Sequence, residues 1–170
     1  MKNTLATIIG MAALALGAHG MAARKQTNRQ VIDQFYEVVD GKKLDRLAEI
    51  EAADLVFTTP MGTVKGPAAH GQMLTGIATA FPNYKHTVKR CVESGNLISC
   101  EGTWSADHTG PMMMPDGKSI PATKKHVELP FVGFGRVQAG KLAEMNVAFD
   151  MMALMQQLGL IPAPPKTASR

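Results

Sequence analysis

Two cysteines placed symmetrically about a turn signal constrain this chain most. Gly95-Asn96 separates two stretches with strand character, residues 84–94 and 97–107. A two-residue turn pairs Cys91 with Cys100 at a non-hydrogen-bonded position, where side chains approach closest. A register slip of one residue would destroy this pairing. The sequence therefore predicts an antiparallel hairpin with a Cys91–Cys100 disulfide if the compartment is oxidising, the alternative being two free, buried thiols.

The first 20 residues have the layout of a secretory signal peptide. Lys2 supplies a basic start, Leu5 to Leu16 form an uncharged apolar run, and Ala18 and Gly20 put small residues at a cleavage site. The run is shorter than the roughly 20 residues that a membrane-spanning helix needs. We expect export to the periplasm or the medium, with no membrane attachment after cleavage. An uncleaved anchor or a buried helix is the alternative.

Composition limits the remaining classes. The length of 170 residues suits one domain, and 45% hydrophobic with 19% charged residues excludes disorder and coiled coil. The formal net charge of +4 is spread along the chain, so no nucleic-acid partner is expected. Twelve Met indicate a soft, adaptable apolar interior.

Helical periodicity gives way to strand patterns along the chain. Thr27 and Gln30 fit a capping box that opens a helix ended by Gly41. Further segments are a short helix at 44–50, a brief strand at 55–58, a helix from 67 to 81, strands at 84–94, 97–107, 124–137 and 141–149, a loop at 108–121 rich in Gly, Pro and Met, and a last helix at 150–158. Helices followed by antiparallel strands indicate an α+β domain.

Residues 28–162 resemble the SnoaL-like polyketide cyclase (ester cyclase) family of the nuclear-transport-factor-2-like superfamily. The final FD…LMQQLG stretch (149–159) is the most specific match, and DHTGP (107–111) ranks second. Weaker matches are QFYEVV (34–39), AFPN (80–83) and GKL (140–142). The resemblance implies a cone-shaped, curved antiparallel sheet wrapped around the N-terminal helices, with a C-terminal helix, an internal pocket and a homodimer. Residues 163–170 would be a disordered tail.

The resemblance also implies an activity. Family members that are cyclases close a polyketide methyl ester by an intramolecular aldol reaction, without a metal or organic cofactor. A carboxylate at the position of Asp150 takes the proton next to a carbonyl, and nearby polar groups hold the enolate oxygen. For this chain we therefore expect an apolar, carbonyl-bearing small molecule as substrate and no cofactor.

Three residues are the candidate catalytic groups. Asp150 lies between apolar neighbours, where desolvation would make it a better base, but it is equally a preferred N-cap of the last helix. His108 could donate a hydrogen bond to an enolate oxygen, or be a solvated loop histidine. Asn146 stands where the family often has Trp, and it is either an oxyanion donor or exposed.

The expected substrate contacts are apolar. Trp104 and His108 share strand parity, so both could face the pocket. Met113 and Met114 would form a flexible lip, with a plain hydrophobic loop as the alternative, and Phe35 would line the wall. The family often carries His where this chain has Thr58, and a polar residue where it has Gly133. Both departures weaken the aldol-cyclase interpretation.

The other histidines carry no motif. His126 and Glu128 share a strand face but have no third metal ligand, so we interpret them as a solvated face. His70 and His86 have no acidic partner at motif spacing. The leading hypothesis is a cofactor-independent cyclase or isomerase. Its alternatives are an exported, non-catalytic binding protein for a hydrophobic small molecule and an interaction module whose cone is filled by Met side chains.

Overall fold

The computed structural model describes residues 26–114 and 117–162. The predicted signal peptide (1–20) and the predicted tail (163–170) lie outside these residues. Among the described residues, no helix is long and apolar enough to span a membrane.

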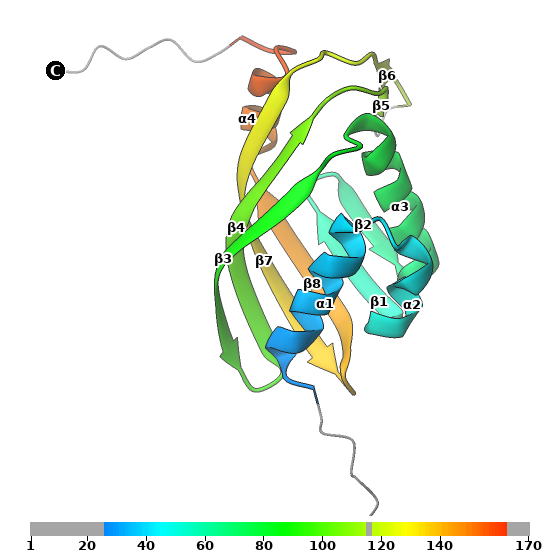
Figure 1. Ribbon diagram of the computed structural model, residues 1–170, viewed down its shortest axis with the longest axis vertical. Coiled ribbons are helices and arrows are strands. Elements are labelled where there is room, and N and C mark those ends of the chain that lie inside the picture. The colour runs from blue at the N-terminus through cyan, green and yellow to red at the C-terminus, as the bar shows by residue number, and fades with distance from the viewer. Residues whose placement is uncertain (1–25, 115–116, 163–170) are drawn as a thin grey trace, which may run out of the picture.

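A curved six-stranded sheet forms one side of the fold (Figure 1), in the order β2-β1-β8-β7-β4-β3. The pairing of β1 with β8 is parallel and the other four are antiparallel. The sheet does not close. Its strands are β1 (Glu51–Thr59), β2 (Gly62–Lys65), β3 (Lys85–Ser94), β4 (Leu97–Asp107), β7 (His126–Gln138) and β8 (Lys141–Phe149).

Helices cover the concave face of the sheet. The helices are α1 (Asn28–Asp40), a 3₁₀ turn (Leu44–Arg46), α2 (Leu47–Ile50), α3 (Gly66–Ala80) and α4 (Met151–Gln157). The predicted capping box of α1 is confirmed: the Gln30 amide donates to Thr27 Oγ1 at 3.2 Å, and the Thr27 amide donates to Gln30 Oε1 at 2.9 Å. Six apolar residues at helical spacing bury α1 against the sheet: Val31, Ile32, Phe35, Tyr36, Val38 and Val39.

The predicted hairpin and its register are confirmed. Cys91 pairs with Cys100 and Ser94 with Leu97, and the structure contains a Cys91–Cys100 disulfide with the Cα atoms 4.1 Å apart. Gly95 provides the left-handed backbone that this turn requires, at φ 60°.

The α+β fold class is confirmed, and the differences lie in short segments. The strand expected at 55–58 runs over Glu51–Thr59, and β2 follows it, since Pro60-Met61 forms a turn rather than an end. The loop expected at 108–121 contains a two-stranded ribbon, β5 (Met112–Met113) with β6 (Ser119–Ile120). Local patterns of two to four residues are too short to reveal such strands.

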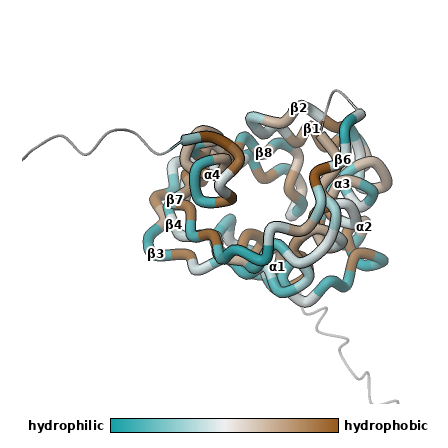
Figure 2. The backbone as a smooth tube through the Cα atoms, turned by 90° about the horizontal axis from the view of Figure 1, so that it is seen from above, coloured by the Kyte–Doolittle hydropathy of each residue, from teal (hydrophilic) through white to brown (hydrophobic). Residues whose placement is uncertain are grey.

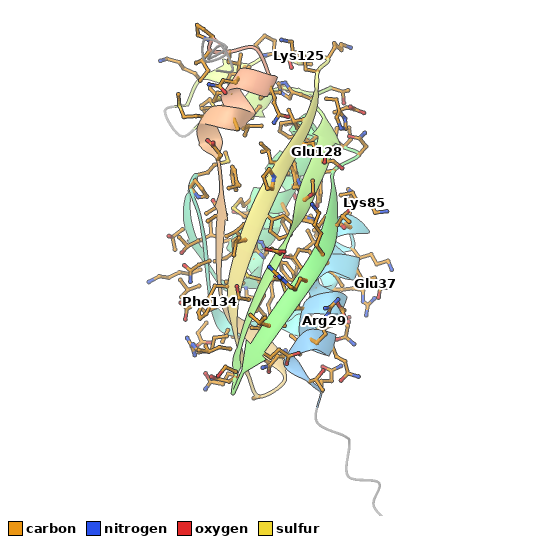
Figure 3. All side chains as sticks on the ribbon, turned by 90° about the vertical axis from the view of Figure 1, so that its left-hand side faces the viewer. Arg29, Glu37, Lys85, Lys125, Glu128 and Phe134 are labelled. Atoms are coloured by element: carbon orange, nitrogen blue, oxygen red, sulfur yellow. A yellow bond between two sulfur atoms is a disulfide. The ribbon has the colours of Figure 1, made fainter. Side chains whose placement is uncertain are left out.

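Strict alternation along β7 defines the two faces of the sheet. Leu129 and Phe131 are buried on the concave side, whereas Val132 and Phe134 are 48% and 40% exposed on the other side (Figure 3). Seen from above, the strands and helices α1 and α3 form a ring (Figure 2). The interior of this ring is where the candidate site lies.

Candidate active site

A cavity of about 580 Å³ lies between the concave face of the sheet and helices α1 and α3. This volume suits a small organic ligand. The four predicted contact residues Phe35, Trp104, Met113 and Met114 line it, and most of the other lining side chains are apolar or aromatic, including Phe57, Leu74, Phe81, Leu129, Phe131, Val147, Phe149 and Leu154. An apolar wall excludes water and strengthens any hydrogen bond made within it.

Methionines gather at one side of this cavity. A smaller hollow of about 130 Å³ lies between β5 and α4, and five Met with Pro60 and Leu154 line it: Met61, Met112, Met114, Met151 and Met155. Unbranched thioether side chains adapt to irregular ligands. This side of the cavity can therefore accommodate ligands of varied shape.

Asp150 and Asn146 lie outside the cavity. Asp150 is exposed and caps α4, where its carboxylate accepts from the Ala153 amide at 3.0 Å. The expectation that apolar neighbours desolvate Asp150 is therefore wrong, because Phe149 turns inward while Asp150 turns to solvent. Asn146 is also exposed, and its amide donates to Glu144 at 3.0 Å. Asn146 and Asp150 do share one side of the chain, as their spacing predicted, but that side faces solvent and not the cavity.

His108 is buried but is not part of the cavity wall. Its Nδ1 accepts from the Thr123 amide at 3.2 Å and lies 3.0 Å from the Thr123 hydroxyl. The ring packs against Phe81, and burial lowers the pKa of His108 below its ordinary value. Through these bonds the His108 ring holds Thr123 next to the end of β4. The alternative of a solvated loop histidine is also wrong.

His86, which was not a predicted site residue, lines the cavity and forms a close pair with a carboxylate. Its Nδ1 lies 2.6 Å from Asp40 Oδ1, and its backbone amide donates to Asp40 Oδ2 at 3.0 Å. The carboxylate therefore fixes the imidazole at two points. Among the described residues none hydrogen bonds to Nε2, and the side chain, 19% exposed, lines the cavity.

Asp40 occupies an unfavourable position for a carboxylate. It is the last residue of α1, and the negative end of a helix dipole disfavours an anion there. Lys42 offsets this cost: its Nζ donates to the carbonyls of Asp40 and Tyr84, each at 2.8 Å, and interacts electrostatically with Asp40. Lys42 also has a left-handed backbone, φ 55°, which L-residues with a side chain rarely adopt. Asp40 at an unfavourable helix end and Lys42 with a rarely adopted backbone conformation thus both help to hold His86.

Two tyrosines flank His86. The Tyr36 ring lies 5.0 Å from the imidazole, and burial, together with the charge of Asp40, raises the pKa of Tyr36 well above its ordinary value. The hydroxyl therefore stays protonated at neutral pH and is available as a donor. Gly133 lies beside this hydroxyl: a Cβ there would be 3.6 Å from Tyr36 Oη, an ordinary van der Waals contact. The Tyr84 hydroxyl is already used, donating to the Val39 carbonyl at 2.8 Å.

A second histidine–carboxylate pair borders the cavity. His70 Nδ1 on α3 lies 2.7 Å from Glu51 Oε1 at the start of β1, and both side chains are 0% exposed. The His70 ring stacks on Phe57 with centroids 4.0 Å apart, and all of these except Glu51 are in the cavity wall.

The predicted solvated face at His126 and Glu128 is present. His126 is exposed and pairs with Asp107 at 2.7 Å, which holds the pKa of that carboxyl below its usual range together with Asn83. The Glu128 side chain is exposed on the outer face (Figure 3). Among residues 26–114 and 117–162, no three His, Cys, Asp or Glu side chains gather as a metal site would require.

The comparisons with known proteins identify the family. The model of the SnoaL-like polyketide cyclases matches residues 29–158. The chain belongs to this family. No curated protein sequence matches the chain. Membership supports a cyclase-type function, without fixing a mechanism or a substrate.

Solved structures of the same fold come from several bacteria. IdmH from Streptomyces antibioticus is 23% identical with a TM-score of 0.68, covering 79% of this chain and 99% of its own. AclR from Streptomyces galilaeus is 22% identical with a TM-score of 0.69, covering 82% and 85%. A SnoaL-like polyketide cyclase from Agrobacterium tumefaciens is 15% identical with a TM-score of 0.65, covering 79% and 99%. At these identities the likeness shows the fold alone.

Proposed function

We propose that this protein abstracts a proton next to a carbonyl of an apolar small molecule, in an aldol-type cyclisation or an isomerisation, with His86 as the general base. The observation that carries the proposal is a cavity-lining imidazole held by a carboxylate at Nδ1, with no hydrogen-bond partner at Nε2 among the described residues, inside a mostly apolar wall. Asp40 Oδ2 accepts from the His86 backbone amide. With Asp40 as a carboxylate, its Oδ1 accepts from His86 Nδ1–H, and Nε2 keeps its lone pair.

The steps use only groups of this chain. His86 Nε2 takes the proton from the carbon, the C–H electron pair forms the enolate, and Asp40 stabilises the resulting imidazolium. The Tyr36 hydroxyl donates to the enolate oxygen. In a cyclisation the enolate carbon then bonds to a second carbonyl carbon, and the new alkoxide takes the proton back from His86. In an isomerisation the imidazolium returns the proton to another carbon.

A simple ketone tests the proposal. 2-Acetonaphthone is apolar, and its methyl protons exchange with D₂O through the enolate. We expect the wild-type protein to accelerate this exchange, measured by mass spectrometry. His86→Gln should lower the rate at least about 100-fold, the range for a lost general base, while naphthyl fluorescence still reports binding.

The matched control is His126→Gln, which removes the exposed histidine–carboxylate pair and should leave the exchange rate unchanged. Two results would contradict the proposal. One is an equal loss of exchange in both variants. The other is binding of the ketone without exchange in the wild type, which would favour the exported binding protein.

A further inference from the structure

The His70–Glu51 pair is incomplete as it stands. Their single bond joins His70 Nδ1 to Glu51 Oε1, and the outer atoms, His70 Nε2 and Glu51 Oε2, have no hydrogen-bond partner among the described residues. Buried polar atoms are normally paired, because an unpaired one loses its hydration without replacement. The pair therefore has unused capacity for hydrogen bonding at the edge of the cavity.

The number of protons on the pair decides whether its outer atoms donate or accept hydrogen bonds. Among the described residues no Lys or Arg side chain bonds to either partner, and the ring lies against Phe57 and Phe35. A net charge in such surroundings is costly, so the pair is neutral as a whole. Of the neutral arrangements, a carboxylic acid donating from Oε1 to Nδ1 and a carboxylate beside an imidazolium make a stronger bond at the observed 2.7 Å than an acid protonated at Oε2 that accepts from Nδ1–H. In those two arrangements His70 Nε2 carries a proton.

We propose that the His70 Nε2–H group binds a carbonyl-type acceptor oxygen of the substrate at the α3 side of the cavity. This inference rests on the proposed function for the class of substrate. His70 and its stacking partners Phe57 and Phe35 all line the cavity. Met73 lies one turn along α3 and also lines the cavity, where an unbranched Met side chain can adapt to a ligand. His70 thus determines specificity, separately from the base.

Two ligands of matched shape isolate a second acceptor oxygen. 2,6-Diacetylnaphthalene has a carbonyl where 2-acetyl-6-isopropenylnaphthalene has a methylene group, and both keep one acetyl group for His86 and Tyr36. We expect the wild-type protein to prefer the diketone over the monoketone about tenfold, as one buried hydrogen bond allows. The second acetyl group of the bound diketone should show an infrared carbonyl stretch shifted to lower frequency than in an apolar solvent.

Variants separate binding from packing. Replacing both partners, Glu51→Leu/His70→Phe, avoids leaving an unpaired buried charge. It should bind both ligands equally and lose the carbonyl shift. Should it fail to fold, Glu51→Met/His70→Leu serves the same purpose. Glu51→Gln should keep the preference, because its amide can donate to Nδ1 and leave the proton on Nε2.

The outcome distinguishes this inference from the proposed function. His86→Gln should abolish deuterium exchange yet keep both the diketone preference and the carbonyl shift. If every variant kept its deuterium exchange while the carbonyl shift remained, only the role of His86 would be overturned. Absence of a diketone preference in the wild type, or its persistence in the double variant, would overturn the role of His70 and make the pair a purely structural link between α3 and β1.

Discussion

Two histidine–carboxylate pairs border one cavity and differ in what surrounds them. His86–Asp40 and His70–Glu51 have almost the same separation, 2.6 and 2.7 Å. The first is about one-fifth exposed and has Lys42 as a nearby cation, whereas the second is fully buried and has no bonded cation among the described residues. We propose opposite roles for the two outer nitrogens: His86 Nε2 accepts a proton, and His70 Nε2 donates a hydrogen bond. The surroundings of each pair, and not the separation within it, distinguish these roles.

The largest expected effect comes from removing only one partner of the buried pair. His70→Leu alone leaves Glu51 buried without its partner, which should lower the free energy of unfolding by about 3–5 kcal/mol. His126→Leu breaks the exposed pair with Asp107 and should change it little, since exposed pairs contribute little. Urea unfolding of both variants measures the contrast. Equal effects would mean that burial does not separate these pairs.

Removing the proposed enolate donor should come next in size. Tyr36→Phe should slow deuterium exchange about 100-fold at unchanged ketone affinity, the usual effect of losing one oxyanion donor. Tyr84→Phe is the control, because the Tyr84 hydroxyl already donates to the Val39 carbonyl and is not available to a ligand. Exchange rates and fluorescence titrations on both variants give the comparison. A larger loss in Tyr84→Phe would reject Tyr36 as the donor.

Lys42 tests whether a nearby cation supports His86. Lys42→Met keeps an unbranched side chain at the same left-handed position but removes the charge. The variant also loses the two bonds from Nζ to the carbonyls of Asp40 and Tyr84, which hold Asp40 and His86 in place. Exchange should therefore fall about tenfold, because a loosened base is misplaced. The exchange rate at saturating ketone measures this loss. An unchanged rate would show that Lys42 leaves the histidine unaffected.

The smallest effect is a pH dependence of stability from His108. Burial lowers its pKa in the folded protein, so the unfolded chain binds the proton more readily. Stability should therefore fall as the pH drops below the ordinary histidine value of about 6.5. Urea unfolding between pH 7.5 and pH 5 measures the slope, which His108→Gln should reduce. An unchanged slope in that variant would assign the effect to other groups.

Local patterns predicted the fold well. The capping box of α1, the hairpin register and the bounds of β4 and β8 depend on residues close in sequence, so the sequence was sufficient for them. The parallel pairing of β1 with β8 joins segments about 90 residues apart, and no local pattern contains that information.

The site was predicted less completely, for the same reason. Trp104, Met113, Met114 and Phe35 line the cavity as expected, because parity and apolar character place them. Asp40 is 46 residues from His86 and Glu51 is 19 from His70, so neither pair has a motif spacing. One signal was present: an Asp in the last turn of a predicted helix opposes the helix dipole. Asp150, in contrast, lies at the start of a predicted helix, where its role as an N-cap already explains an Asp.

The most direct test compares deuterium exchange into 2-acetonaphthone by Asp150→Ala and His86→Gln, with the folded fraction of each taken from urea unfolding. Asp150→Ala should lose about 0.5–2 kcal/mol of stability as a missing cap and keep wild-type exchange per folded molecule. His86→Gln should stay folded and lose exchange at least about 100-fold. Exchange that is lost in Asp150→Ala and kept in His86→Gln would contradict the account and move the base from the cavity to the rim of α4.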